Sequence, residues 1–152
     1  MSDKIIKFLA HNGKISVICA DTTEMVEKAR QTHDMSPVVT AGFGRLLTII
    51  AIMATEMKGS KDKLTVQLKG NGPIGLMIAT ANNKPIVKGY ATNPVVDIPL
   101  NEDGKLDVGG AVGYEGYINV VKDLGLKDPY IGISPLVSGE IAEDFANYFV
   151  NS

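Results

Sequence analysis

The first residues that could do chemistry are three glycines, Gly70, Gly72 and Gly75, in the string GNGPIG after a strand-like run. A dinucleotide-binding loop has this G-x-G-x-x-G spacing, but it also needs a helix whose N-terminal N–H groups face the pyrophosphate. The residues after Gly75 reach a turn at Asn82 and Asn83 too soon for a crossover helix. The sequence therefore favours a turn between two antiparallel strands, with positive φ at one or more of these glycines.

The other reactive side chains are scattered along the chain. His11 falls in an expected turn and His33 at a helix end, and neither has a nucleophile near it in the sequence. Cys19 shares an expected strand face with Ile15 and Val17, which predicts a buried, unreactive thiol. Acidic residues occur as adjacent pairs on polar segments, which places them on solvated faces rather than across a cleft. We therefore expect no enzyme.

The composition is typical of a soluble globular domain. The chain has 152 residues, of which 21% are charged, and its formal net charge is -2. It has no block of Lys or Arg, so we expect no nucleic-acid partner. Its single cysteine excludes an internal disulfide and any zinc site built only from cysteines of this chain. The first apolar run is too short for a signal peptide, so a cytoplasmic location is expected.

The elements that must position these residues begin with a hairpin and a short helix. Two β-branched runs surround Asn12 and Gly13, and an Asn-Gly pair between apolar segments predicts a β-hairpin. Asp21 followed by Glu24 predicts a capping box at the start of a helix. The charged residues of this helix indicate an exposed face.

A second helix is expected from about Ser36 to Lys58, because Ser36 and Pro37 suit an N-cap and a first helical turn. It is apolar on all sides and about 30 Å long, which is also the thickness of a bilayer core. Arg45 near its middle opposes membrane insertion, so we predict a buried central helix that other elements wrap. The side chains expected to be buried are Leu46, Leu47, Ile49, Ile50 and Ile52.

Strand-like runs predict a sheet around this helix. Residues 63–69 alternate apolar with polar, residues 76–81 are apolar on both faces, and residues 85–92 complete an antiparallel meander. Residues 93–116 show no sustained period and predict a long connection. Residues 117–123 predict another strand, and residues 130–137 a further one weakened by Pro135. A final helix, capped by Ser138, is expected to carry an apolar stripe.

Several strings taken together resemble one protein family. They are KLTVQLKGNGPIG, NEDGKLDVGGAVG and YINVVKDLGLKDPYIGISPLVSGEIAEDFANYF, and the hairpin, the TTE helix start, QTHD and the apolar helix match in the same order. The chain resembles the heat-shock protein 33 family of bacterial redox-regulated holdase chaperones over essentially its whole length. The resemblance implies an α+β fold, with a large, mainly antiparallel sheet wrapped on a central buried helix.

The same resemblance implies a function and a domain organisation. Family members bind unfolding proteins without ATP and are switched by oxidation of a C-terminal zinc centre, whose cysteines have C-x-C and C-x-x-C spacing. This sequence has no such segment. Residues 1–152 are therefore expected to be the N-terminal chaperone core, cut short of its last strands, without zinc. Dimers in the family exchange C-terminal elements, so a homodimer is expected.

The resemblance suggests a broad apolar surface for clients, by which we mean unfolding proteins. We expect this surface on an uncovered sheet face, with Leu76, Ile78, Tyr90, Ile118 and Val120 as candidates. Candidates for a dimer contact on the final helix are Phe145, Tyr148 and Phe149.

A second class of function stays open, namely a small-molecule or nucleotide-binding domain that uses the glycine-rich segments around Gly70 and Gly109. A holdase would protect many unrelated proteins from aggregation, whereas a nucleotide binder would be stabilised by its own ligand.

Overall fold

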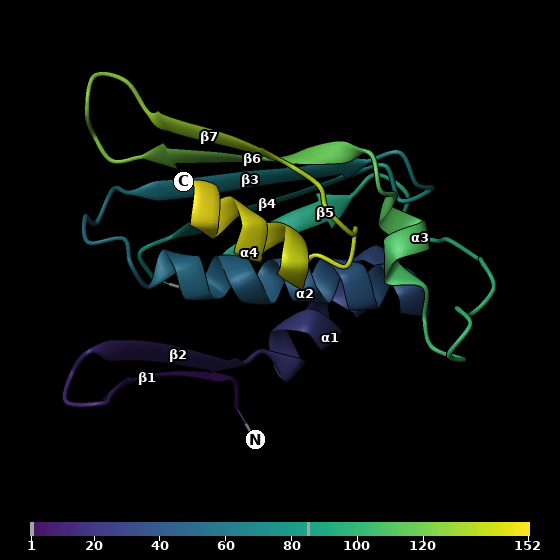
Figure 1. Ribbon diagram of the computed structural model, residues 1–152, viewed down its shortest axis with the longest axis horizontal. Coiled ribbons are helices and arrows are strands. Elements are labelled where there is room, and N and C mark those ends of the chain that lie inside the picture. Colours follow the sequence, from purple (N-terminus) through teal and green to yellow (C-terminus); the bar gives the residue numbers. More distant parts are fainter. Residues whose placement is uncertain (1, 85) are drawn as a thin grey trace.

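The computed structural model describes residues 2–84 and 86–152, and its elements form a sheet, a helical layer and a separate hairpin (Figure 1). The first six elements are β1 (Lys4–Ala10), β2 (Ile15–Asp21), α1 (Thr23–His33), α2 (Pro37–Ala54), β3 (Lys63–Gly70) and β4 (Leu76–Asn82). They are followed by β5 (Val87–Ala91), α3 (Val108–Val112), β6 (Gly116–Asp123), β7 (Tyr130–Pro135) and α4 (Ala142–Asn151).

The main sheet has five antiparallel strands in the order β5-β4-β3-β6-β7. β3 is central, because Val66 lies opposite Ala79 of β4 on one side and opposite Val120 of β6 on the other. β3, β4 and β5 form the expected meander, and the chain then returns through a long connection to pair β6 with β3. The sheet and its helices confirm the expected α+β fold.

α2 is the core helix of this fold. It lies along one face of the sheet and packs mainly on β4 and β5 (Figure 1). Leu46 and Ile50 are fully buried, in one cluster with Leu68 of β3 and Met77 of β4. Burying a side chain of this size contributes about 1.5–3 kcal/mol. By length and composition α2 could cross a membrane, but 61% of it is buried inside the domain.

Two details of α2 differ from the expectation. The helix ends at Ala54 rather than near Lys58. The N–H groups that follow donate to carbonyls three residues earlier, as in a 3₁₀ turn, and the Glu56 N–H, for example, donates to the Met53 carbonyl at 3.1 Å. Ile49 and Ile52 are only half-buried, since the sheet covers one side of the helix and leaves the other partly open.

Two glycines of α2 give opposite expectations for stability. A Cβ at Gly42 would make an ordinary contact, 3.5 Å from Val108 Cγ1, whereas a Cβ at Gly44 would lie only 2.8 Å from Val26 Cγ1 of α1. Alanine is favoured over glycine inside a helix, so we expect Gly42→Ala to raise the free energy of unfolding by about 0.5–1 kcal/mol. Gly44→Ala should show no gain in the same urea titration. An equal gain for both variants would contradict the close packing of α1 on α2.

The N-terminal hairpin forms as predicted, as a separate two-stranded sheet of β1 and β2 that projects from the body (Figure 1). Its turn residues His11, Asn12 and Gly13 all have positive φ. Cys19, opposite Ile6 in the register, is exposed, so the prediction of a buried thiol is wrong. The alternation of residues along β2 correctly predicts which face of the hairpin carries Cys19. Because the hairpin projects from the body, however, most of both faces remains exposed.

The cap of α1 also differs from the prediction. The carboxylate of Asp3 accepts hydrogen bonds from the backbone N–H groups of Glu24 and Met25, each at 2.8 Å. Asp21 accepts instead from the hydroxyl and the backbone N–H of Thr23, and these bonds lower the pKa of Asp21. The predicted capping box of Asp21 and Glu24 is therefore wrong, and a residue that precedes β1 caps α1 from outside.

α4 begins at Ala142, and Asp144 rather than Ser138 organises its start. The buried Asp144 carboxylate accepts four backbone N–H groups: Val137 at 2.7 Å, Ser138 at 3.0 Å, Gly139 at 3.3 Å and Ile141 at 2.8 Å. These bonds hold the bend between β7 and α4. The Ser138 hydroxyl accepts only from the Glu140 N–H, so the prediction of Ser138 as the cap is wrong.

Candidate functional site

Within the described residues, no helix packs on one of the two faces of the five-stranded sheet. α2 packs on β4 and β5, and α4 packs on β7 and β6, both on the same side of the sheet (Figure 1). Leu64, Val66 and Leu68 of β3 point to this covered side and are buried. The residues that alternate with the buried ones form the opposite side, which we call the open face. Its apolar side chains are Leu76, Ile78, Tyr90, Tyr117, Val121, Ile131 and Ile133.

The open face exposes large apolar groups. Ile133 is 70% exposed, Ile131 is 59% exposed and Tyr90 is 50% exposed. Ile78 is half-buried and lies directly opposite Tyr90 in the register, so the apolar contact continues from β4 to β5. Neighbouring exposed apolar side chains of this size are typical of a surface that binds another molecule.

The structure divides the five predicted surface residues between the two faces. Leu76, Ile78 and Tyr90 lie on the open face, as expected. Ile118 and Val120 are 0% exposed and point to the covered side, so their placement on an uncovered face is wrong. Both faces of β6 carry apolar residues, and its sequence alone did not show which set meets the core.

The two most exposed apolar residues of the open face, Ile131 and Ile133, were not among the residues predicted from the sequence. Ile131 and Ile133 alternate with Gly132 and the buried Ser134 on β7. Pro135 weakens the prediction of a strand over these residues. In the structure Pro135 is the last residue of an edge strand, where its missing N–H group removes no hydrogen bond between strands. The alternation Ile-Gly-Ile-Ser was the signal that could have identified these residues.

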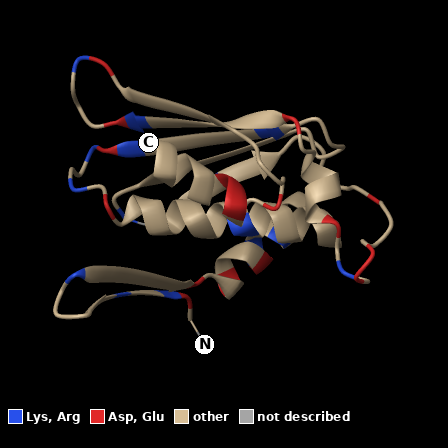
Figure 2. Cartoon of the chain, viewed as in Figure 1, with Lys and Arg blue, Asp and Glu red and all other residues tan. Residues whose placement is uncertain are grey.

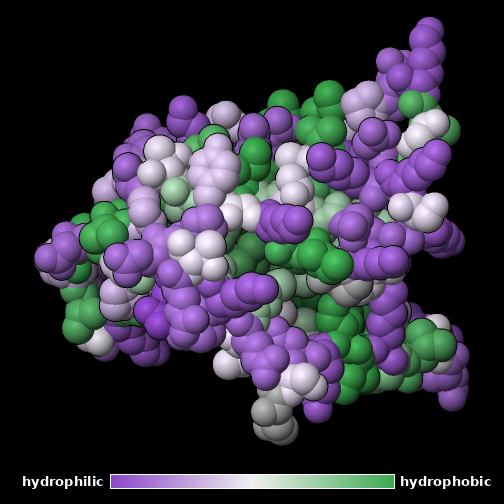
Figure 3. Space-filling model, turned by 180° about the vertical axis from the view of Figure 1, so that it is seen from behind, coloured by the Kyte–Doolittle hydropathy of each residue, from purple (hydrophilic) through white to green (hydrophobic). Residues whose placement is uncertain are grey.

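A second apolar region lies between the hairpin and the body. A cavity of about 570 Å³ lies there, and its lining combines apolar residues such as Ile5, Met25, Ala51 and Val87 with the polar residues Asp3, Lys4, Asp21, Thr22 and Lys28. From behind, Figure 3 shows hydrophobic atoms gathered at this level, between the hairpin at the lower right and the body. The hairpin itself exposes Phe8, so its junction with the body is an apolar, partly uncovered region.

Comparison with known proteins identifies the family. The sequence model of the family described as Hsp33 protein matches residues 3–152. The chain belongs to the Hsp33 family. Two relatives are each named 33 kDa chaperonin, one from Thermoanaerobacter pseudethanolicus at 51% identity and one from Clostridium tetani at 49%. In both cases the match covers 100% of this chain and 52% of the relative.

A solved structure agrees with this assignment. The crystal structure of the Hsp33 homolog from Thermotoga maritima, a 33 kDa chaperonin, matches with a TM-score of 0.90 and 42% identity. The match covers 97% of this chain and 50% of that chain. This Hsp33 family chain therefore spans about half the length of the relatives that it matches.

The candidate dimer residues of this Hsp33 family chain differ in exposure. Phe145 and Tyr148 are buried, and their rings lie edge to face with centroids 6.4 Å apart. Burial, and then the neighbouring Tyr130 hydroxyl, raise the pKa of Tyr148. Phe149 is 51% exposed. Phe145 and Tyr148 thus belong to the chain's own core, and Phe149 is the one of the three that is open to a partner.

The glycine pattern of the Hsp33 family chain has a structural role. The N–H groups of Gly72 and Ile74 donate to the carbonyls of Val112 and Ala111, at 2.9 and 3.0 Å. Gly75 has a φ of 76°, which confirms the predicted turn with a glycine at positive φ. These donors are engaged within the chain, which disfavours the nucleotide-binding alternative.

Neither the acidic residues nor the cysteine form a metal centre in the part of the chain that the structure describes. Within residues 2–84 and 86–152, no group of three or more His, Cys, Asp or Glu side chains is placed to share an ion. The expectation that this chain holds no zinc stays a prediction.

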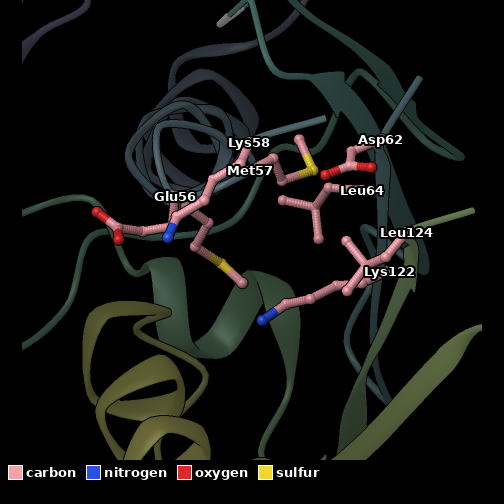
Figure 4. A pocket seen from close by; sticks show the side chains of 8 residues that line it. Glu56, Met57, Lys58, Asp62, Leu64, Lys122 and Leu124 are labelled. Atoms are coloured by element: carbon pink, nitrogen blue, oxygen red, sulfur yellow. The ribbon is translucent and has the colours of Figure 1, made fainter. Parts of the chain in front are cut away.

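A small cavity of about 290 Å³ lies where the end of α2 meets the start of β3 and the end of β6. Figure 4 shows Lys122 extending into it from β6, with Leu64 and Leu124 on the same side. Three of its polar groups have partners within the chain. The Lys122 ammonium lies over the Tyr130 ring, 5.3 Å from the centroid, the Glu56 carboxylate accepts from Lys7, and the Asp62 carboxylate accepts from the Gly59 N–H. This cavity therefore offers no constellation for catalysis.

Proposed function

We propose that this chain is a holdase domain that binds unfolding proteins on its open face, without ATP, and keeps them from aggregating. The observation that carries the proposal is a helix-free sheet face with exposed Tyr90, Ile131 and Ile133 in a member of a chaperone family. Burial of apolar surface is non-directional, so such a face suits clients of many sequences.

The wider organisation belongs to the same proposal. We take residues 1–152 as the N-terminal core of a longer cytoplasmic Hsp33 protein that is regulated through a zinc domain elsewhere in that protein. A homodimer is part of the proposal, and the exposed Phe149 of α4 is its candidate contact.

The test is light scattering from a thermally unfolding client protein with and without the chain. We expect the double variant Tyr90→Asp and Ile133→Asp to need about tenfold more chain for the same suppression, because two carboxylates replace apolar contacts. The matched control is Leu100→Asp, which changes an equally exposed apolar residue in the connection between β5 and α3. A double variant that unfolds at the wild-type temperature and suppresses scattering equally well would contradict the proposal.

The same assay includes two oxidation controls. Cys19 is the only cysteine of the chain and is exposed, so peroxide can reach it. Without a second thiol in the chain, oxidation of Cys19 cannot close an internal disulfide. We therefore expect peroxide-treated protein and the Cys19→Ser variant to suppress scattering like the reduced protein. Suppression that appears only after oxidation and is lost in Cys19→Ser would assign a switch to this residue.

A further inference from the structure

The open face is not a continuous apolar surface, because its central strand is polar. β3 presents Thr65, Gln67 and Lys69 to this side, and Asn119 of β6 lies directly opposite Gln67. This polar strip separates two apolar groups. One group lies on β4 and β5 and includes Leu76, while the other lies on β6 and β7 and includes Tyr117.

The charges of the open face are mainly basic. Its strands present Lys63, Lys69 and Lys88, and one carboxylate, Asp123, lies opposite Lys63 at the end of the strands. The whole chain has a formal net charge of -2, so the positive charge is local to this face. Figure 2 shows most Asp and Glu residues in loops and helices, whereas Lys residues also colour the strands.

Lys69 has the most favourable position for binding an anion beside apolar groups. Leu76 lies opposite it on β4 and Tyr117 lies opposite it on β6. Neighbouring strands are about 4.8 Å apart, so the aliphatic stem of Lys69 lies between two apolar side chains. Lys69 is exposed and takes part in none of the ion pairs between described residues.

We propose that the open face prefers unfolded segments in which a carboxylate accompanies the apolar residues. This inference rests on the proposed holdase function and names the kind of client segment. Apolar side chains of the client cover the two apolar groups, and its Asp or Glu pairs with Lys69 across the polar strip. Once bound, this pair is partly shielded from water by Leu76 and Tyr117, which strengthens the attraction over that of a free surface pair.

The test compares two fluorescein-labelled peptides that have the same apolar residues and either Glu or Lys at the central position. In fluorescence anisotropy at low ionic strength, we expect the Glu peptide to bind about threefold to tenfold more tightly. Raising the salt to about 1 M, where the screening length is about 3 Å, should remove most of the difference.

Two variants assign the preference to the open face. Lys69→Glu should lower the affinity ratio of the Glu peptide to the Lys peptide to one or less. Lys105→Glu makes the same charge change in the exposed connection before α3 and should reduce the ratio only slightly. A Glu preference that persists unchanged in Lys69→Glu would overturn the assignment to this residue.

The outcomes separate this inference from the proposed function. If both peptides bind the wild-type chain equally and light scattering is still suppressed, the charge preference is wrong and the holdase proposal stands. If neither peptide binds and scattering is not suppressed, both proposals fail.

Discussion

Replacing Asp144 with alanine will lower the free energy of unfolding by about 3–5 kcal/mol, because four backbone N–H groups lose a buried charged acceptor. The Asp144 side chain is fully buried, and its two oxygens bond the N–H groups of residues 137, 138, 139 and 141. No other side chain in the described structure is bonded to those four N–H groups, so the bend between β7 and α4 loses its organising contact.

Urea denaturation followed by circular dichroism measures this loss. Asp144→Asn keeps the shape of the side chain and one acceptor oxygen. It should therefore lower the free energy of unfolding by less than Asp144→Ala does. The matched control is Glu143→Ala, an exposed carboxylate one position earlier on α4, which should cost less than about 1 kcal/mol. Equal losses for Asp144→Ala and Glu143→Ala would show that the carboxylate does not hold the bend.

Gly72→Ala will be nearly as damaging, because a Cβ at this position has no space. It would overlap the carbonyl oxygen of Ala111 and lie 2.6 Å from the carbonyl carbon of Val112, both backbone atoms of α3. The loop must then move away and lose its hydrogen bonds to α3, at a cost of about 3 kcal/mol or more. The thermal unfolding midpoint of the purified variant is the measurement.

Gly13→Ala is the control for the general cost of replacing a glycine. Gly13 has a φ of 79° in the hairpin turn, but no atom lies within 4 Å of the position that a Cβ would take there. Its substitution should therefore cost only the left-handed backbone strain, about 1–2 kcal/mol. If Gly72→Ala is no worse than Gly13→Ala, the close approach of the loop to α3 is not what requires glycine there.

The parts of the fold that follow from local pattern were predictable. The hairpin followed from Asn12 and Gly13, and the core helix from an apolar run that begins with Ser36 and Pro37. The contacts that join distant segments were not predictable in this way. Asp3 caps α1 and Asp144 organises the bend before its own helix, and neither role has a signal in the nearby sequence.

The candidate surface was predicted only in part, for a related reason. Alternation shows which residues of a strand share a face, but where both sets are apolar it does not show which set meets the core. On β4 the small Ala79 and Ala81 face α2, which leaves Ile78 on the open face. On β6 the same uncertainty led to the wrong choice of Ile118 and Val120, whose side chains fill the core.

The position of the hairpin divides the chain into two levels of stability. The buried apolar core begins at Met35, and α1 contributes no buried residue to it. The hairpin is joined to its neighbours by Asp3 at the start of α1 and by Lys7, whose ammonium bonds Glu56 at 3.0 Å. A two-stranded sheet with so few buried contacts opens at low free energy, so its amide protons exchange with solvent through local opening. The amide protons of β3 exchange only when the whole domain unfolds. Each local opening of the hairpin uncovers more of the apolar side of α2.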